Sequence, residues 1–311
     1  MVRQQTVKDI LEWIELNLEK PLLIDDIARK SGYSRRNILL LVRNMVGIPL
    51  GSYIRQRRLC RAAMLVRLTS MTIGDIALRL HFDSQQTFSR EFKKRFGCTP
   101  REYRKRDDWD LESICTNWLT RQTDLPDCHL IMLTEMHFSG SVFSYHTTVG
   151  ETPPKDEITY RRTQLTKQLA RWKKDIYCMN RFQNSSRNIN AIAVESHIGT
   201  LISGAKMPTI GSFSLPGGMY AMFHYEGPWA EYVNLPRRFY LEALPAAGLV
   251  RTQGCDLEHF RAAGTRLGEK SDWVDVDLYI PVRNKTACVD EPVAASEYIS
   301  PQKKRQEDEH T

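Results

Sequence analysis

Long hydrophobic runs are missing from this 311-residue sequence. No stretch approaches the roughly 20 consecutive apolar residues that a membrane-spanning helix needs. The first residues, MVRQQTVKDILEW, carry basic and acidic side chains where a secretory signal has a continuous apolar segment. We therefore expect a soluble, cytoplasmic protein without a membrane partner.

The sequence also lacks the short motifs that mark the commoner catalytic and metal sites. Its seven cysteines form no C-x-x-C pair, so neither a zinc site nor a disulfide framework is indicated. No G-x-S-x-G, H-E-x-x-H, phosphate-binding loop or dinucleotide fingerprint is present. We accordingly predict no metal, no cofactor and no enzymatic activity.

Positive charge is concentrated in one third of the chain. Residues 1–106 hold 22 Lys and Arg against 10 Asp and Glu, a balance of +12, whereas the remainder holds 22 against 27, a balance of −5. A basic domain beside a mildly acidic one suggests that the first binds a polyanion and the second has another role.

The basic third contains an internal repeat. Residues 24–55, IDDIARKSGYSRRNILLLVRNMVGIPLGSYIR, align with residues 73–105, IGDIALRLHFDSQQTFSREFKKRFGCTPREYRK. Each copy indicates a short helix, a tight turn and a second helix that begins after a Ser or Asp. The pattern predicts two helix-turn-helix units in an all-α domain. A helix predicted at residues 49–69 joins them, with Arg55, Arg57, Arg58 and Arg61 on a basic face.

Four polar residues of the second copy fall on one face of its second helix, opposite Phe88, Phe92 and Phe96; they are Gln85, Gln86, Ser89 and Arg90. Gln pairs with adenine and Arg with guanine, so we predict that these side chains contact bases. A merely solvated polar face is the alternative, which the duplicated motif and the charge disfavour. We predict phosphate contacts at Arg43, Arg55, Arg58, Lys93 and Lys94.

The pattern D-I-A-x₄-F-x-S-Q-x₂-F-x-R-x-F-K-x₂-F-G-x-T-P stands at Asp75 to Pro100. With it, residues 5–106 resemble the DNA-binding domain of the AraC/XylS family of transcriptional regulators. The resemblance implies two helices in successive major grooves of a bent, asymmetric promoter site. It also implies an activator of stress or drug-resistance promoters, with RNA polymerase as a partner.

The first unit departs from this family at Arg36, Leu39 and Leu40, where relatives carry an aromatic residue, a Gln and an Arg. Leucine offers no hydrogen bond to a base. Base reading then depends on Arg35, Arg36 and Asn37, with the leucines at most touching thymine methyl groups. Two alternatives stay open: the unit only grips the backbone, or the leucines bind another protein.

The second half shows strand and helix patterns in an order that occurs twice. Alternating or apolar runs predict strands at residues 129–146, 191–198, 217–229 and 273–282, and amphipathic runs predict helices at residues 153–175 and 230–249, the latter interrupted near Pro236. The order predicts an α+β domain of two β-α-β-β halves.

The segments MYAMFHYEGPW and VDLYIPV make residues 127–283 similar to the gyrase-inhibitory-protein-like effector-binding domain. That resemblance implies a central cleft for hydrophobic, often cationic, small molecules. Residues 107–126 would then be a linker, and residues 284–311 are polar, of mixed charge and predicted to be disordered.

The resemblance places Asp277 in the last strand, where relatives often carry a glutamate. Alternation puts Asp275, Asp277 and Tyr279 on one face of this strand. We predict that Asp277, ringed by Trp229, Tyr220 and Tyr279, holds a cationic ligand, with Glu226 a further candidate. The alternative is a solvated face or a filled aromatic core.

The leading hypothesis is a sequence-specific DNA-binding transcriptional regulator that a small molecule or partner modulates through its second domain. A second hypothesis is a protein-interaction module, similar to the gyrase inhibitor, that DNA binding merely recruits. A third is a small-molecule hydrolase fused to a DNA anchor. Titration with lipophilic cations separates the first two hypotheses, and turnover of a titrated ligand would support the third. A genome-wide map of bound sites would identify the targets.

Overall fold

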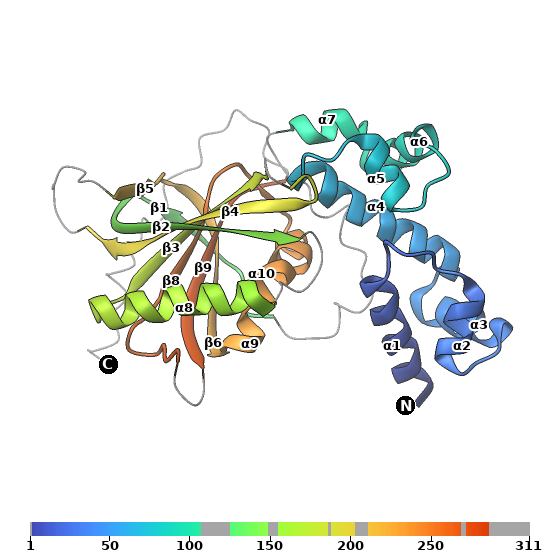
Figure 1. Cartoon of the computed structure of the whole chain (residues 1–311), viewed down its shortest axis with the longest axis horizontal. Helices are drawn as coiled ribbons and strands as arrows, with labels where there is room; N and C mark the ends of the chain where they lie inside the picture. Colours follow the sequence, from blue (N-terminus) through green and yellow to red (C-terminus); the bar gives the residue numbers. More distant parts are fainter. Residues whose placement is uncertain are drawn as a thin grey trace.

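The computed structural model describes residues 2–106, 125–148, 155–185, 188–202, 211–268 and 272–285. Helices form one part of the molecule, and an antiparallel sheet with helices packed on it forms the other (Figure 1). The predicted linker and tail lie outside the described residues, apart from residues 125–126 and 284–285. The two-part layout expected from the charge and motif patterns is therefore confirmed.

The first three helices pack around one apolar core because each presents hydrophobic residues at helical spacing. The Ser34 hydroxyl accepts a hydrogen bond from the Asn37 backbone N–H and so caps the third helix. Gly47 ends that helix with a φ of 84°, a left-handed conformation that glycine adopts without strain. These helices are α1 (Val2–Leu16), α2 (Ile24–Ser31) and α3 (Arg35–Val46).

The next four helices enclose an aromatic core. Phe88 and Phe92 are fully buried, and Phe92 also packs edge-on against Tyr103 with ring centroids 5.4 Å apart. Hydroxyl side chains cap three of the helices: Thr72, Ser84 and Thr99 each accept from a backbone N–H three residues further on. The helices are α4 (Leu50–Leu68), α5 (Ile73–Arg79), α6 (Gln85–Phe96) and α7 (Pro100–Lys105).

Helix α4 does not carry the uniform basic face that its sequence predicts. Arg57 is buried and pairs with Glu15, with 2.7 Å between Arg57 Nε and Glu15 Oε1. Arg61 is buried as well and pairs with Glu19 at 3.3 Å. Two of the four arginines therefore join α4 to the end of α1 and the segment after it, because a buried charge needs a partner.

The second part is built on a sheet whose neighbouring strands are antiparallel. Its strand order is β1-β6-β9-β8-β3-β4-β2-β5, with β7 paired to β9. The strands are β1 (His129–Leu133), β2 (Met136–Thr148), β3 (Ile176–Asn184), β4 (Ala191–Leu201), β5 (Ser212–Leu215), β6 (Gly218–Pro228), β7 (Leu249–Arg251), β8 (Asp256–Phe260) and β9 (Trp273–Asn284).

Helices cover one face of this sheet. Helix α8 (Lys155–Trp172) packs against β2 and β4. After β6 the helical segment is broken, as the sequence predicts, and Pro236 and Pro245 lie within it. Its pieces are α9 (Trp229–Tyr232), α10 (Leu235–Arg238), the π-helix η2 (Phe239–Ala243) and α11 (Leu244–Ala246).

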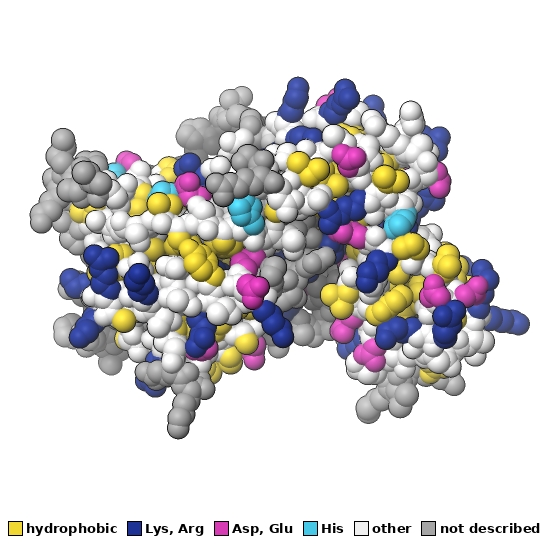
Figure 2. Space-filling model, in the orientation of Figure 1, with side chains coloured by type: hydrophobic (Ala, Val, Ile, Leu, Met, Phe, Trp, Pro, Cys, Tyr) yellow, Lys and Arg dark blue, Asp and Glu magenta, His cyan; other side chains and the backbone are white. Residues whose placement is uncertain are grey.

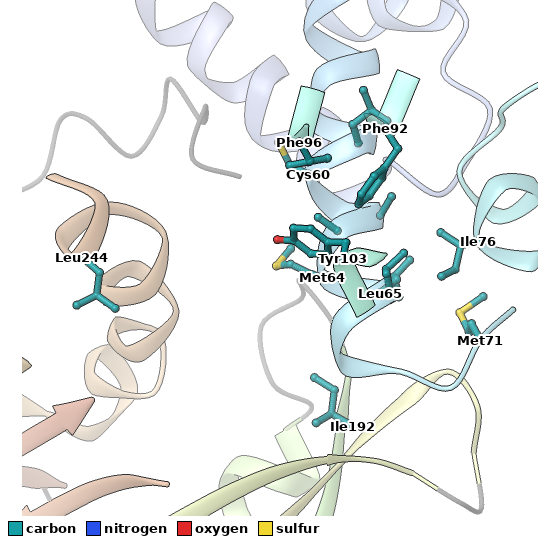
Figure 3. Packing of buried hydrophobic residues seen from close by; sticks show 14 of the residues in the cluster. Cys60, Met64, Leu65, Met71, Ile76, Phe92, Phe96, Tyr103, Ile192 and Leu244 are labelled. Carbon is teal, nitrogen blue, oxygen red and sulfur yellow. The ribbon is translucent and has the colours of Figure 1, made fainter. Parts of the chain in front are cut away.

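The two parts contact each other at the start of β4 and the loop that precedes it. Ile192 is buried in the same apolar cluster as Met71 and Leu65 (Figure 3). Arg79 Nη1, at the end of α5, lies 3.0 Å from Asn190 Oδ1. The Ser70 hydroxyl donates to a backbone carbonyl oxygen of the same loop, at 3.2 Å. The sheet is thus docked against the turn that precedes α5.

In the described part of the chain, no single helix is long and apolar enough to cross a membrane. Only α3 and α4 taken together, at a bend of 58°, meet that length and composition. Within the same residues, no group of three or more His, Cys, Asp or Glu side chains is arranged to hold a metal ion.

Candidate nucleic-acid interface and candidate ligand site

Helix α6 presents a polar row to solvent. Gln85, Gln86 and Arg90 are exposed and Ser89 is half-buried, whereas Phe88 on the opposite side is fully buried. Lys93 and Lys94 continue along the helix as exposed cations. The helix is short and capped at both ends, so this row has a fixed orientation on the domain.

The structure also shows what holds the start of this row. A Cβ atom added at Gly74 would lie 3.1 Å from Gln85 Oε1, so the first side chain of α6 packs directly on the start of α5. Glu91, on the next turn, accepts two hydrogen bonds from Arg55 of α4, at 2.6 and 2.5 Å. Helix α6 is therefore fixed against both of its neighbours.

The first helix pair presents a different surface. Arg35, Arg36 and Asn37 are exposed at the start of α3, and Arg35 lies 3.4 Å from the Asp25 carboxylate. Leu39 packs against the apolar core, whereas Leu40 is 56% exposed. Leu40 is therefore the more accessible of the two leucines. Figure 2 shows hydrophobic side chains on the surface of this part of the molecule, among basic and acidic ones.

The predicted phosphate contacts fall into two groups. Arg43, Lys93 and Lys94 are exposed. Arg55 is engaged with Glu91, and Arg58 donates from Nε to the Leu18 carbonyl at 3.0 Å and from Nη2 to the Lys20 carbonyl at 2.9 Å. These last two arginines thus stabilise the fold, which their positions in the sequence did not indicate.

Asp277 lies on the sheet face opposite α8 and is already neutralised. Its carboxylate accepts hydrogen bonds from Arg261, from His224 Nδ1 at 2.9 Å and from the Tyr279 hydroxyl at 3.3 Å. Burial lowers the pKa of Arg261, but the carboxylates of Asp277 and Asp275 outweigh it and raise that pKa above its ordinary value. Asp277 is therefore a poor candidate for binding an external cation.

The ring of aromatic residues predicted around Asp277 does not form. Trp229 packs with Val274 and Val276 on the opposite face of β9. Tyr279 does contact Asp277, and Tyr220 shares their face, but its hydroxyl donates to the Pro216 carbonyl at 3.0 Å. Glu226 is exposed and lies opposite Asp275 in the register.

A different carboxylate occupies the helix-covered face. Glu258 of β8 is buried and accepts hydrogen bonds from Arg161 of α8, from the Tyr232 hydroxyl at 2.5 Å and from Asn180 Nδ2 at 2.8 Å. The Arg161 guanidinium carbon lies 5.5 Å from the centre of the Trp229 ring. One charged cluster therefore joins α8, α9 and the two central strands.

Burial and charge together set the ionisation of this cluster. Burial lowers the pKa of Arg161, but the Glu258 carboxylate outweighs it and holds the guanidinium in its charged form. Burial and the same carboxylate raise the pKa of the Tyr232 hydroxyl well above its usual range. Burial likewise raises the pKa of the Cys178 thiol to about 12, so this thiol stays protonated and unreactive near neutral pH.

These two surfaces define a class: a DNA-binding transcriptional regulator with a second domain for small molecules. A model described as a helix-turn-helix domain matches residues 27–106, and a model described as a GyrI-like small molecule binding domain matches residues 152–283. The first match begins within α2 and ends after α7, and the second begins after β2 and ends within β9, so each match covers most of one part of the molecule.

The chain belongs to the AraC family of transcriptional regulators, as its sequence motif predicted. It is 50% identical over 224 residues to the HTH-type transcriptional regulator YkgA of Escherichia coli (strain K12), covering 72% of this chain and 93% of that protein. It is 29% identical over 288 residues to the right origin-binding protein of the same strain, with coverages of 89% and 98%. The F1 operon positive regulatory protein of Yersinia pestis is 31% identical over 287 residues, with coverages of 91% and 89%.

Proposed function

We propose that the chain binds promoter DNA sequence-specifically, with α2–α3 and α5–α6 acting as two helix-turn-helix units in successive major grooves. The polar row of α6 carries this proposal. Gln85, Gln86 and Arg90 are exposed on a capped helix and have the chemistry to read adenine and guanine edges. Ser89 completes the row, and Arg43, Lys93 and Lys94 are the side chains that we assign to phosphates.

The first unit contributes less to selectivity than the second. Leu39 is partly buried against the core, so Leu40 is the more accessible leucine for a thymine methyl group, beside the polar groups of Arg35, Arg36 and Asn37. Fewer hydrogen-bonding side chains on α3 mean fewer bases discriminated by direct contact. Arg55 and Arg58 position α4 between the two units and would have to leave their present partners to reach DNA.

A selection from random duplexes tests this assignment. After the preferred site is found, each half is altered in turn and the dissociation constant is measured at fixed salt. Each altered base pair in the half read by α6 should cost about 1–3 kcal/mol of binding free energy. Each altered base pair in the half read by α3 should cost less. Leu40→Ala serves as a control that leaves discrimination at the α6 half unchanged. Equal losses in both halves would contradict the proposal.

We infer that the second domain, residues 127–283, consists of two β-α-β-β halves and binds a small-molecule effector on its helix-covered face. The sequence of elements supports two halves: β2, α8, β3 and β4 are followed by β6, the broken helix, β8 and β9. The cluster around Glu258 lies where these halves meet, since β3 and β8 are neighbours. The domain would regulate transcription rather than catalyse a reaction, and RNA polymerase is the expected partner at an activated promoter.

The loop between β3 and β4 offers the physical connection between the effector and the DNA. Asn180 of β3 contacts Glu258, and Ser196 of β4 donates to Asn180 at 2.6 Å. The same two strands end at the loop that contacts Arg79 of α5. A shift of these strands on effector binding would therefore reach the helix pair that contains α6.

A further inference from the structure

Polar atoms near Glu258 are buried without hydrogen-bond partners among the described residues. They include two N–H donors, Arg161 Nε and Trp229 Nε1, and one carboxyl oxygen, Glu157 Oε2. Leaving a buried polar group unpaired costs about 1–3 kcal/mol, so such groups are uncommon unless something else satisfies them. These three atoms, one of them on Arg161 itself, would therefore be satisfied by a molecule with complementary groups.

Arg161 lies close to both of the other side chains. Glu157 and Arg161 are one turn apart on α8, and the Arg161 guanidinium lies against the Trp229 ring at 5.5 Å. Aromatic rings border the cluster: Tyr232 lies 5.9 Å from Trp229 and 5.7 Å from Tyr225 between ring centroids. These flat surfaces favour an aromatic ligand.

The charge of the cluster argues against a cationic ligand. Glu258 is already paired with Arg161 and accepts two further hydrogen bonds, so its charge is compensated within the domain. A cation would meet the Arg161 guanidinium in a buried place, where a like charge is costly. Burial raises the pKa of Glu157, against the opposing effects of a hydrogen bond with Thr147 and of the Arg161 charge.

We propose that the effector site takes an uncharged aromatic compound whose hydrogen-bond acceptor meets Arg161 Nε and Trp229 Nε1 and whose donor meets Glu157. A primary carboxamide on a fused ring has this combination. The proposal rests on the effector role proposed above for the helix-covered face. The wall on the Trp229 side is built from short helical pieces and the π-helix η2, a type of irregularity common at functional sites.

Two probes of matched size test the proposal on the full chain: 2-naphthamide and (2-naphthyl)methylammonium. Isothermal titration gives each dissociation constant, and the indole N–H resonances of ¹⁵N-tryptophan-labelled protein report contact at Trp229. We expect 2-naphthamide to bind at least tenfold more tightly than the cation and to shift the Trp229 resonance downfield. Trp229→Phe, which keeps a ring and removes the donor, should weaken 2-naphthamide about tenfold. Trp13→Phe, in the helical part, should change neither constant.

Three results would overturn the proposal: tighter or equal binding of the cation, binding of the amide without movement of the Trp229 resonance, or no binding of either probe. In the last case a buried water would be the group that satisfies these atoms. The same protein samples are tested for binding to the selected duplex. If the protein still binds the duplex while the two probes do not rank as expected, this proposal is wrong but the assignment as a DNA-binding regulator stands.

Discussion

The buried pair of Arg161 and Glu258 gives a sharp prediction of stability. Glu258→Ala removes the acceptor for Arg161, Tyr232 and Asn180 at once and leaves a buried guanidinium without its counter-charge. Side chains exposed by only 12% and 2% receive little help from solvent. We expect a loss of about 3–5 kcal/mol in the free energy of unfolding, and a fall in melting temperature of roughly 6–20 °C.

The double variant Arg161→Met with Glu258→Met separates the charge pair from the rest of the cluster. It removes both charges and leaves only the donors of Tyr232 and Asn180 unpaired, so it should cost about 1–3 kcal/mol. That cost is smaller than the cost of Glu258→Ala alone. The exposed pair of Asp26 and Arg29 is the control, and Asp26→Ala should change stability by less than about 0.5 kcal/mol.

Urea unfolding followed by circular dichroism measures these differences. The two domains share an apolar interface, so a single unfolding curve can contain both. Hydrogen exchange in peptides from α8 and β8 therefore measures the stability of the second domain by itself. The single variants Arg161→Met and Glu258→Met complete the comparison. A double variant that loses as much as the sum of these two would refute the reasoning, since the two charges would then be energetically independent.

Three further predictions concern other parts of the molecule. Burial raises the pKa of Glu157 above its ordinary value of 4.5, so the folded state binds this proton more tightly than the unfolded state does. The free energy of unfolding of the wild type, relative to that of Glu157→Gln, should therefore fall as pH rises from 4.5 to the raised pKa and then level off. Urea titration at each pH measures this difference, and a rise with pH would contradict the prediction. Ser84→Ala removes the cap of α6 and should cost about 1 kcal/mol, which thermal unfolding measures against Ser52→Ala, an exposed hydroxyl of α4; equal losses would argue against the cap. Asn190→Ala removes the contact with Arg79 and should leave the affinity for 2-naphthamide unchanged. The change in DNA affinity that 2-naphthamide causes should become at least twofold smaller in this variant. If an electrophoretic shift assay shows the same change as in the wild type, this loop is not the connection.

The helical domain could be predicted closely from the sequence. The spacing of Phe88, Phe92 and Phe96 fixes the buried face of α6, and a Ser or Thr marks the start of four helices. The burial of Arg57 and Arg61 could not be predicted, because their partners Glu15 and Glu19 lie 42 residues away. A basic stripe on a helix does not reveal whether a distant segment covers it.

The sequence did not predict the proposed ligand site because its two central strands are buried on both faces. All five residues of β8 are buried, as are the first five of β3, so neither strand shows the alternation that marks a strand with one exposed face. Alternation did place Asp275, Asp277 and Tyr279 on one face of β9 correctly. Alternation did not reveal which face of the sheet the helices cover. The covered face is the one that carries Glu258, whereas Asp277 lies on the other face.

A comparison of two multiple variants tests the central claim, that α6 reads bases, most directly. In one variant Gln85, Gln86, Ser89 and Arg90 are replaced by alanine, and in the other Lys93 and Lys94. Dissociation constants are measured for the selected duplex and for an unrelated one over a range of salt. In the first variant, the ratio of the affinities for the two duplexes should fall close to one. The second variant should bind both duplexes more weakly by the same factor, and the slope of log affinity against log salt should decrease by about 2 in magnitude. A first variant that keeps the full ratio would contradict the account.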